Sequence, residues 1–190
     1  MNPVCLVIGA GAGIGGTVGA RFAREGYHAC LCRRSDEDGL NRLVEEIRKD
    51  GGSATGFLLN AVEPGSIEQR VADVEAEIGP IEVAIYNLGA QIGDRALQDT
   101  SPKAFETGWR LGTFGLFRLA SVLFPLMVER GKGTLLVTSS TAALIWSHRS
   151  SILASCAGMS RSRMRSAGRA GTCQVSAKYC RMRSGRFVST

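Results

Sequence analysis

The sequence predicts an α/β fold over residues 1–144, in which a doubly wound parallel sheet carries helices on both faces. Two observations predict this fold. Short apolar runs of strand length alternate with longer amphipathic stretches throughout this part of the chain. A glycine-rich segment, residues 9–15, also lies directly between the first apolar run and the first amphipathic stretch. Strands that alternate with helices form parallel sheets through right-handed crossovers, which place helices on both faces.

The first two strand–helix units are expected within residues 4–52. Val4–Ile8 and His28–Cys32 are short, continuous apolar runs typical of buried strands. The helix after the first strand ends at Gly26, and the next helix begins with acidic residues, which suit the positive end of a helix dipole. The apolar faces of these two helices comprise Ile14, Val18 and Phe22 in the first and Leu40, Leu43, Val44 and Ile47 in the second.

The same alternation continues to the end of the predicted domain. Three further apolar runs are expected to be strands, and two amphipathic stretches are expected to be helices. The strands are Thr55–Leu59, Glu82–Tyr86 and Gly133–Ser139, and the helices are Ser66–Ile78 and Ala104–Arg130.

Basic residues are distributed unevenly over the 190 residues. The net charge is +6 at pH 7, but residues 1–145 carry 14 basic and 17 acidic side chains. Residues 146–190 carry nine basic side chains, no acidic ones and many serines. Because such segments bury too little apolar surface to fold, we treat residues 145–190 as a separate basic tail that is expected to be disordered. The sheet is therefore expected to be incomplete at the C-terminus.

Two interpretations of the tail remain open. One is a shifted reading frame or a truncated splice product, because the acidic residues and the α/β pattern are both lost near Ile145. The other is a native basic arm, since segments rich in Arg and Ser can neutralise phosphates. The aromatic residues of the tail are isolated rather than regularly spaced, so specific nucleic-acid binding is not expected.

The cysteines and the most apolar region exclude several other classes of protein. Cys5, Cys30 and Cys32 lie in strand-like runs, and no CxxC pair occurs, so we expect reduced thiols with no disulfide framework and no metal site. The apolar region at 111–128 contains Arg118 and Pro125 and is not expected to span a membrane. The chain starts directly with a strand rather than a signal peptide, so a cytoplasmic location is expected.

The glycine-rich turn carries the chemistry of the predicted fold. Glycine permits a tight turn and lets the backbone approach a pyrophosphate, which then lies at the N-terminus of the following helix. The strand–turn–helix context therefore predicts a nucleotide-binding site of the Rossmann type. The candidate phosphate-binding residues are Gly9, Gly11, Gly13, Ile14 and Gly15.

The spacing Gly9-x-x-x-Gly13-Ile14-Gly15 resembles the glycine motif of the short-chain dehydrogenase/reductase family. Three other positions strengthen the resemblance, which covers residues 3 to about 144. The fourth strand ends where the family has an Asn-Asn-Ala-Gly motif, and the third where it usually has an Asp that contacts adenine. The fifth strand ends where the family has its catalytic serine. Asn87 and Gly89 match the motif after the fourth strand. After the third strand, Asn60, followed by Ala61, stands in place of the Asp. After the fifth strand, Ser140 stands at the position of the catalytic serine.

The end of the second strand predicts which dinucleotide is bound. Sites for NAD place an acid there to accept from the ribose hydroxyls, whereas this strand ends in Arg33 and Arg34, with no acid until Asp36. Two guanidinium groups suit a ribose 2′-phosphate. We therefore expect NADP(H) rather than NAD, the alternative being that the two arginines form a solvated basic turn.

The catalytic residues of the family are only partly matched. The family uses a Tyr with a Lys four residues later, but no Tyr-x-x-x-Lys occurs in this chain, and the tyrosine position falls near Leu153. Gly112 stands where the family has an Asn on the long helix. General acid catalysis is expected to be lost without the Tyr–Lys pair. His148 lies in the basic tail and is expected to be solvated rather than to act as a substitute.

The resemblance implies an NADP(H)-dependent oxidoreductase that transfers a hydride between the nicotinamide and a carbonyl or alcohol substrate. Whether this chain is active is left open by the missing Tyr–Lys pair. The alternative is a non-catalytic nucleotide-binding or interaction protein that uses the basic tail as an arm. The resemblance further implies a homodimer formed through the helix at residues 105–130, for which the alternative is a core helix covering the sheet.

Overall fold

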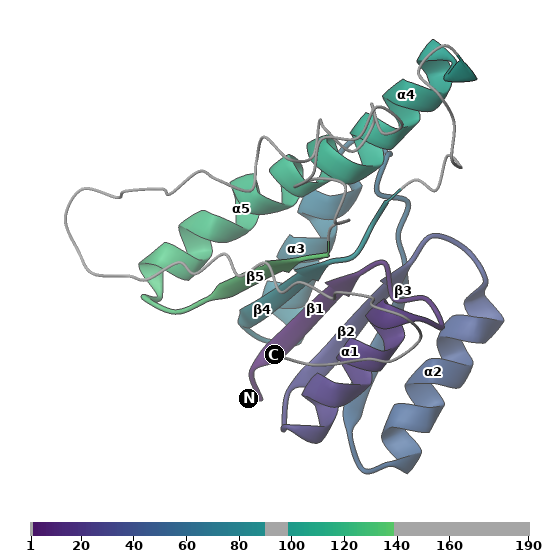
Figure 1. Cartoon of the computed structure of the whole chain (residues 1–190). Helices are drawn as coiled ribbons and strands as arrows, with labels where there is room; N and C mark the ends of the chain where they lie inside the picture. Colours follow the sequence, from purple (N-terminus) through teal and green to yellow (C-terminus); the bar gives the residue numbers. More distant parts are fainter. Residues whose placement is uncertain (1, 90–98, 139–190) are drawn as a thin grey trace, which may run out of the picture.

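The computed structural model describes residues 2–89 and 99–138, which form a five-stranded sheet with helices on both faces (Figure 1). The strand order is β3-β2-β1-β4-β5, and every neighbouring pair is parallel, which confirms the predicted doubly wound α/β fold. The strands are β1 (Val4–Ile8), β2 (His28–Arg33), β3 (Ser53–Leu58), β4 (Ile81–Tyr86) and β5 (Thr134–Val137). The helices are α1 (Ile14–Arg24), α2 (Glu37–Lys49), α3 (Ser66–Glu77), α4 (Pro102–Trp109) and α5 (Gly115–Glu129).

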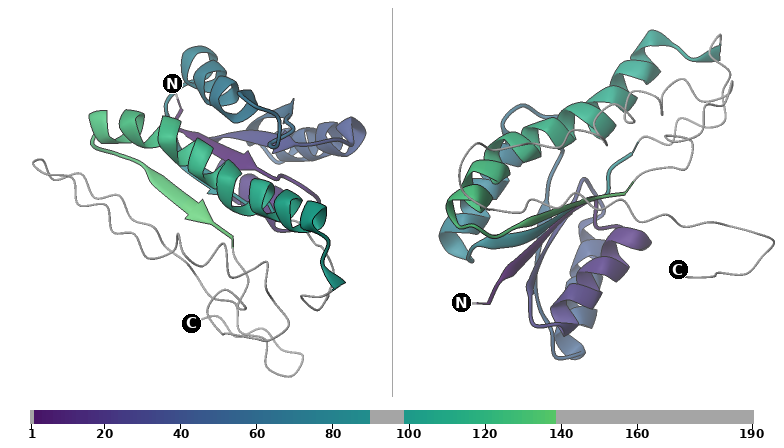
Figure 2. Two further views of the ribbon diagram at one scale, coloured as in Figure 1. Left: turned by 90° about the horizontal axis from the view of Figure 1, so that it is seen from above. Right: turned by 60° about the vertical axis from the view of Figure 1, so that its left-hand side comes forward.

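Two hydrophobic cores lie on opposite faces of the sheet. Helices α1 and α2 cover one face, and α3 and α5 cover the other (Figure 2). Successive residues of β1 alternate between the two cores, with Leu6 and Ile8 facing α3 and α5 and Cys5 and Val7 facing the opposite side. A strand buried on both faces must be apolar throughout, which explains the unbroken apolar run of β1.

Helix α1 packs on the sheet through small residues. The predicted apolar face is only partly buried, since Val18 and Phe22 are half-buried and Ile14 is 62% exposed. A Cβ at Gly19 would lie 2.5 Å from Cδ2 of Leu31 in β2, so the helix lies close to the sheet. The residues that α1 buries are Gly15, Gly16, Gly19 and Ala23.

The single long helix predicted for residues 104–130 is divided into three parts. A π-helical segment, η2 (Arg110–Phe114), separates α4 from α5 and contains Gly112. The hydroxyl of the buried Tyr86 donates to the carbonyl of Leu111 in this segment. Such a contact competes with the regular helical hydrogen bonds, and π-helical turns arise where the i→i−4 ladder is interrupted.

The long helical region would also suffice, by length and composition alone, to cross a membrane. The stretch Pro102–Glu129 is 28 residues long with a mean hydropathy of 1.7 over its most apolar window. Its Leu119, Leu123 and Met127 are nevertheless buried in the core beside the sheet, together with Arg118. The core helix of a globular domain has the same length and hydropathy, so this feature alone does not indicate a membrane protein.

Several predictions fall on residues outside the described ranges. These are the catalytic assignment of Ser140, the basic tail at 145–190 and the last part of the fifth strand. Within the described ranges, the predicted burial of Cys5, Cys30 and Cys32 in the strands is confirmed. Burial raises the pKa of each of these thiols to about 12.

Candidate functional site

Backbone hydrogen bonds join the carboxyl ends of all five strands into one continuous edge. The amide of Leu59 binds the carbonyl of Arg33 at 2.8 Å, which joins the end of β3 to the end of β2. The turn after β1 binds the carboxyl end of β2, the segment after β4 binds β1, and the segment after β5 binds β4. These bonds are Gly9 N to Cys32 O (3.0 Å), Ala10 N to Cys32 O (2.9 Å), Asn87 N to Ile8 O (2.8 Å) and Thr138 N to Tyr86 O (3.0 Å).

The chain order places a topological switch point at this edge. From β1 the chain winds outward to β2 and β3, then returns to place β4 on the other side of β1. In doubly wound sheets, ligands bind outside the carboxyl ends of the strands where the winding direction reverses. That point lies between β1 and β4, at the glycine-rich turn.

Two of the glycines in this turn are required by the protein itself. Gly9 has φ +99°, and a Cβ there would lie 2.5 Å from the carbonyl oxygen of Asn87. A Cβ at Gly15 would collide with the carbonyl of Gly9 and lie 2.9 Å from Nδ2 of Asn87. These two positions therefore allow β1, β4 and α1 to approach one another closely.

Two other glycines have no such packing role. A Cβ at Gly11 or at Gly13 would meet no described atom within 4 Å, and both face open space at the N-terminus of α1. No side chain in the described ranges caps this helix end, whose first amides lack intrahelical partners. Ile14, in the first turn of the helix, is exposed beside them. Small residues at an uncapped helix N-terminus leave room for a phosphate group to approach the backbone.

Asn87 fixes the position of the turn from the β4 side. Its Nδ2 donates to the carbonyl of Gly9 at 2.9 Å, and its Oδ1 accepts from Oγ1 of Thr138 at 2.8 Å. The amide is therefore oriented from both sides. Gly89 follows two residues later and is exposed, and a Cβ there would meet no described atom within 4 Å.

The two arginines at the end of β2 differ in their surroundings. Arg33 forms an ion pair with Asp36 at 2.7 Å, with its side chain 25% exposed. Asp36 is also the N-cap of α2, because its Oδ1 accepts from the amide of Gly39 at 3.0 Å. Arg34 is exposed and forms no ion pair with any residue in the described ranges. Both carboxylate oxygens of Asp36, the first acid after β2, are thus engaged, while the guanidinium of Arg34 has no ion-pair partner among the described residues.

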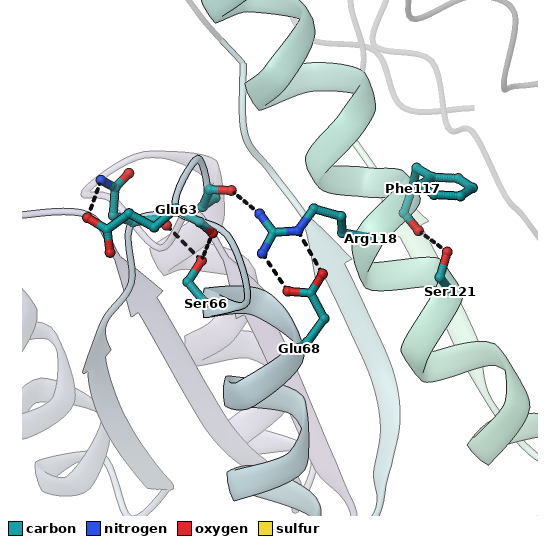
Figure 3. A network of polar contacts seen from close by, with 8 residues as sticks. Glu63, Ser66, Glu68, Phe117, Arg118 and Ser121 are labelled. Atoms are coloured by element: carbon teal, nitrogen blue, oxygen red, sulfur yellow. Dashed lines mark hydrogen bonds and ion pairs between the residues drawn. The ribbon is translucent and has the colours of Figure 1, made fainter.

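The loop after β3 holds the two residues predicted to lie near adenine. Nδ2 of Asn60 donates to Oε1 of Glu63 at 2.8 Å, whereas its Oδ1 is buried and has no hydrogen-bond partner among the described residues. Ser66 Oγ lies 2.8 Å from the carbonyl of Asn60. The carbonyl of the buried Ala61 accepts from Nη1 of Arg118 at 3.0 Å (Figure 3).

Arg118 reaches this loop from α5 and is itself held by Glu68 of α3. Its Nε donates to Oε1 of Glu68 at 2.7 Å, and its Nη2 pairs with Oε2, so the contact is bidentate (Figure 3). This hydrogen bonding lowers the pKa of Glu68 and raises that of Arg118. The pair therefore remains charged under all ordinary conditions.

The structure places all the predicted cofactor residues along one edge, where three further residues that the sequence analysis missed hold them in position. Gly16 binds the carbonyl of Gly11 through its amide, and a Cβ there would lie 2.5 Å from that oxygen. Thr138 holds Asn87, and Arg118 holds Ala61. Gly16 continues the run of glycines in the sequence and was detectable. The other two depend on contacts between distant segments, and no local pattern marks them. Ser140 lies outside the described residues.

The strand order, the glycine-rich turn and its position at the switch point define a protein of the Rossmann type. Over residues 3–167 the sequence matches the family model of the short chain dehydrogenases. The chain therefore belongs to the short-chain dehydrogenase family of oxidoreductases, which use nicotinamide cofactors.

Individual relatives agree with this assignment. A fatty acyl-CoA reductase from Acinetobacter baylyi is 32% identical over 143 residues, which cover 74% of this chain and 48% of that protein. A short chain dehydrogenase from Pseudocercospora fijiensis is also 32% identical over 143 residues, covering 73% of this chain and 45% of the relative. The chain thus spans about half the length of these curated relatives.

Solved structures share the fold. A protein from Burkholderia xenovorans assigned to the short-chain dehydrogenases/reductases superposes with a TM-score of 0.71 at 27% identity, over 82% of this chain and 60% of that one. A gluconate 5-dehydrogenase from Burkholderia cenocepacia, crystallised with NADP and tartrate, superposes with a TM-score of 0.74 over the same shares of the two chains. At 23% identity, the second likeness concerns the fold alone.

Proposed function

We propose that this chain is the nucleotide-binding part of an NADP(H)-dependent oxidoreductase that transfers a hydride between the nicotinamide and a carbonyl or alcohol substrate. The observation that carries the cofactor proposal is the open glycine turn. No described atom requires glycine at Gly11 or Gly13, yet both directly precede the N-terminus of α1 at the switch point of the sheet. A pyrophosphate is the group for which such a turn is suited.

The residues at the end of β2 fit a 2′-phosphate better than a pair of ribose hydroxyls. Asp36 is committed to the amide of Gly39 and to Arg33, so it is a poor acceptor for ribose hydroxyls. The exposed Arg34 has no competing acid partner in the described part of the chain and can bind a phosphate bidentately. We therefore assign NADP(H), rather than NAD, as the preferred dinucleotide.

The adenine end of the cofactor fits the loop after β3. The unpartnered Oδ1 of Asn60 is an acceptor, and the exocyclic amino group of adenine is a donor. The bond to Glu63 fixes which amide atom is the oxygen. An acceptor that is buried without a partner is costly, and a bound adenine would relieve that cost.

Catalysis depends on residues beyond the cofactor site. When bound, NADP(H) supplies or accepts the hydride. By the family resemblance, Ser140 positions the substrate carbonyl. The Tyr–Lys pair that moves the proton in the family has no counterpart in this sequence. We therefore expect this chain to bind NADP(H) and to turn over carbonyl substrates very slowly or not at all.

The cofactor preference is tested with Arg34→Ala and a matched control, Arg42→Ala. Arg42 is also exposed, on α2, and forms no ion pair with a described residue. We expect Arg34→Ala to weaken NADPH binding about tenfold or more while leaving NADH binding nearly unchanged. Arg42→Ala should change neither affinity. Equal NADPH-to-NADH affinity ratios in the wild type and Arg34→Ala would contradict the assignment.

A second candidate function is a non-catalytic nucleotide-binding protein, and the missing Tyr–Lys pair favours it. A panel of aldehydes and ketones, followed by the loss of NADPH absorbance, distinguishes the two. Measurable turnover that disappears in Ser140→Ala would support the enzyme. Tight NADPH binding without turnover of any member would support the binding protein.

The exposed aromatic residues of the long helical region are the surface we propose for a homodimer. Trp109 and Phe114 stack with ring centroids 5.2 Å apart, and Phe114 and Phe117 lie 6.4 Å apart. All three are about two-fifths exposed or more, which is unusual for large aromatic side chains. A second copy is the occupant we propose, and Phe117→Glu should shift the sedimentation of the chain toward monomer. An unchanged oligomeric state would contradict this assignment.

A further inference from the structure

The loop after β3 is held in place by one buried arginine. Within the described ranges, Arg118 is the one charged side chain classed as buried, with 7% of the residue exposed. Its guanidinium donates to the carbonyl of Ala61 and to both carboxylate oxygens of Glu68 (Figure 3). Because a guanidinium is planar and rigid, these three bonds fix the carbonyl relative to α3 and α5.

This carbonyl belongs to the residue directly after Asn60. The loop is therefore restrained on one side by Ser66, which lies 2.8 Å from the carbonyl of Asn60, and on the other by Arg118. Between the two restraints, Oδ1 of Asn60 is buried and has no hydrogen-bond partner among the described residues. Its direction follows from the backbone that Ser66 and Arg118 hold, together with the bond from Nδ2 to Glu63.

We propose that Arg118 is a positioning residue for base recognition, which sets the preference of the dinucleotide site for adenine. This inference rests on the function proposed above. The amino group of adenine donates to Oδ1 of Asn60, whereas hypoxanthine has an oxygen at that position and cannot donate. Arg118 acts only through the backbone of Ala61 and touches neither the base nor the phosphates.

The chain provides a matched control at the opposite end of the same two helices. Arg130, the C-cap of α5, pairs with Glu75 of α3 through two bonds of 2.5 and 3.0 Å. It also donates to a backbone carbonyl, that of Ile81 at 3.2 Å. Since Ile81 begins β4, this second Arg–Glu pair lies at the amino edge of the sheet, away from the adenine loop.

The test compares Arg118→Met with Arg130→Met in the full chain. Isothermal titration calorimetry gives the affinity for NADPH and for its deaminated analogue, which carries hypoxanthine in place of adenine. We expect the wild type and Arg130→Met to prefer NADPH by about 3- to 10-fold, the value of one hydrogen bond. In Arg118→Met the ratio of the affinity for NADPH to the affinity for the analogue should fall close to one, while the analogue still binds through the glycine turn. Arg118→Lys, which keeps the charge but not the fork, should give the same loss and serves if the methionine variant does not fold.

The outcomes separate this inference from the proposed function. A wild-type preference that survives in both Arg118 variants would overturn the role of Arg118 and leave the cofactor assignment intact. An equal loss in Arg130→Met would also overturn it, because general packing of α3 on α5 would then be the cause. A folded wild-type chain that binds neither dinucleotide would overturn the proposed function, and this inference with it.

Discussion

The side-chain amide of Asn87 donates to the carbonyl of Gly9 at 2.9 Å, which ties the end of β4 to the first residue of the glycine-rich turn. The carbonyl oxygen of the same side chain accepts from Thr138 after β5. One amide therefore connects three neighbouring strands at the edge where the winding of the sheet reverses. The position of the turn depends on this connection as much as on its own glycines.

Replacing Asn87 should therefore cost more stability than removing one of its partners. Asn87→Ala removes two hydrogen bonds and leaves the Gly9 carbonyl without its side-chain donor, so we expect a loss of about 2 kcal/mol in the free energy of unfolding. Thr138→Val removes the bond to Asn87 at 2.8 Å and a longer contact of the same hydroxyl with the carbonyl of Tyr86 at 3.4 Å. Because one exposed hydroxyl with a single proton makes both, the change should cost about 0.5–1 kcal/mol. Urea denaturation of the two variants measures both values. An equal or larger loss in Thr138→Val would contradict the bridging role of Asn87.

The glycines of the turn should separate into a structural and a functional group. Gly15→Ala places a methyl group against the carbonyl of Gly9 and should destabilise the fold by about 1–3 kcal/mol. Gly11→Ala meets no described atom within 4 Å and should change stability by no more than about 0.5 kcal/mol. The same Gly11 variant should weaken NADPH binding about tenfold, because the new methyl group would stand where the phosphates approach. Thermal unfolding and calorimetry test the pair, and normal NADPH affinity in Gly11→Ala would contradict this division.

The contact of Tyr86 with the helical region predicts a non-additive pair of substitutions. A Cβ at Gly115 would collide with the Tyr86 hydroxyl, so Gly115→Ala should cost about 1–3 kcal/mol. In the Tyr86→Phe background the hydroxyl is gone, and the same alanine should cost at least 1 kcal/mol less, about the coupling expected of residues in contact. A double-mutant cycle by denaturant unfolding measures this coupling. Additive losses would show that the two residues are not in contact.

His28 should make stability depend on pH below its ordinary pKa of 6.5. Its Nδ1 lies 2.6 Å from Oγ of Ser53 and its Nε2 2.9 Å from Oγ1 of Thr55. Burial, and secondarily the charge of Arg48, lower the pKa of His28 below its ordinary value of 6.5. The unfolded chain therefore binds a proton at higher pH than the folded chain does. The contribution of His28 to the free energy of unfolding should be fully present above pH 6.5, and this free energy should fall as the pH is lowered below that value.

Denaturant unfolding across this range tests the assignment with His28→Gln and with the chain's other histidine, His148→Gln, as control. Glu68 does not interfere, because its pKa is lowered from 4.5 and its contribution is lost only at more acidic pH. The slope should flatten in His28→Gln and persist in His148→Gln. The reverse pattern would place the titrating group elsewhere.

Local patterns in the sequence were sufficient for most of the fold. Unbroken apolar runs such as Val4–Ile8 mark strands buried on both faces, and their alternation with helices determines a parallel sheet. The division of the long helix was not predictable, because it depends on the contact of Tyr86 with Leu111, 25 residues away. The exposure of Ile14 was missed because periodicity alone does not reveal that glycines form the packed face of α1.

The candidate site was predicted where it consists of short motifs. The glycine turn, Asn60 and Asn87 were identified by their position after apolar strands, and the structure places all three at one edge. The residues that hold them were not identified. Arg118 lies 57 residues from Ala61 in the sequence, and Thr138 lies 51 residues from Asn87. Only the folded chain brings these side chains to the loops that they restrain.

The proposed binding of NADP(H) at the carboxyl edge of the sheet is open to calorimetric titration of the full chain with NADPH, after circular dichroism has shown a cooperative thermal transition. We expect one NADPH to bind per chain and NADH to bind at least about tenfold more weakly. A cooperatively folded chain that binds neither dinucleotide would contradict the proposed NADP(H) site.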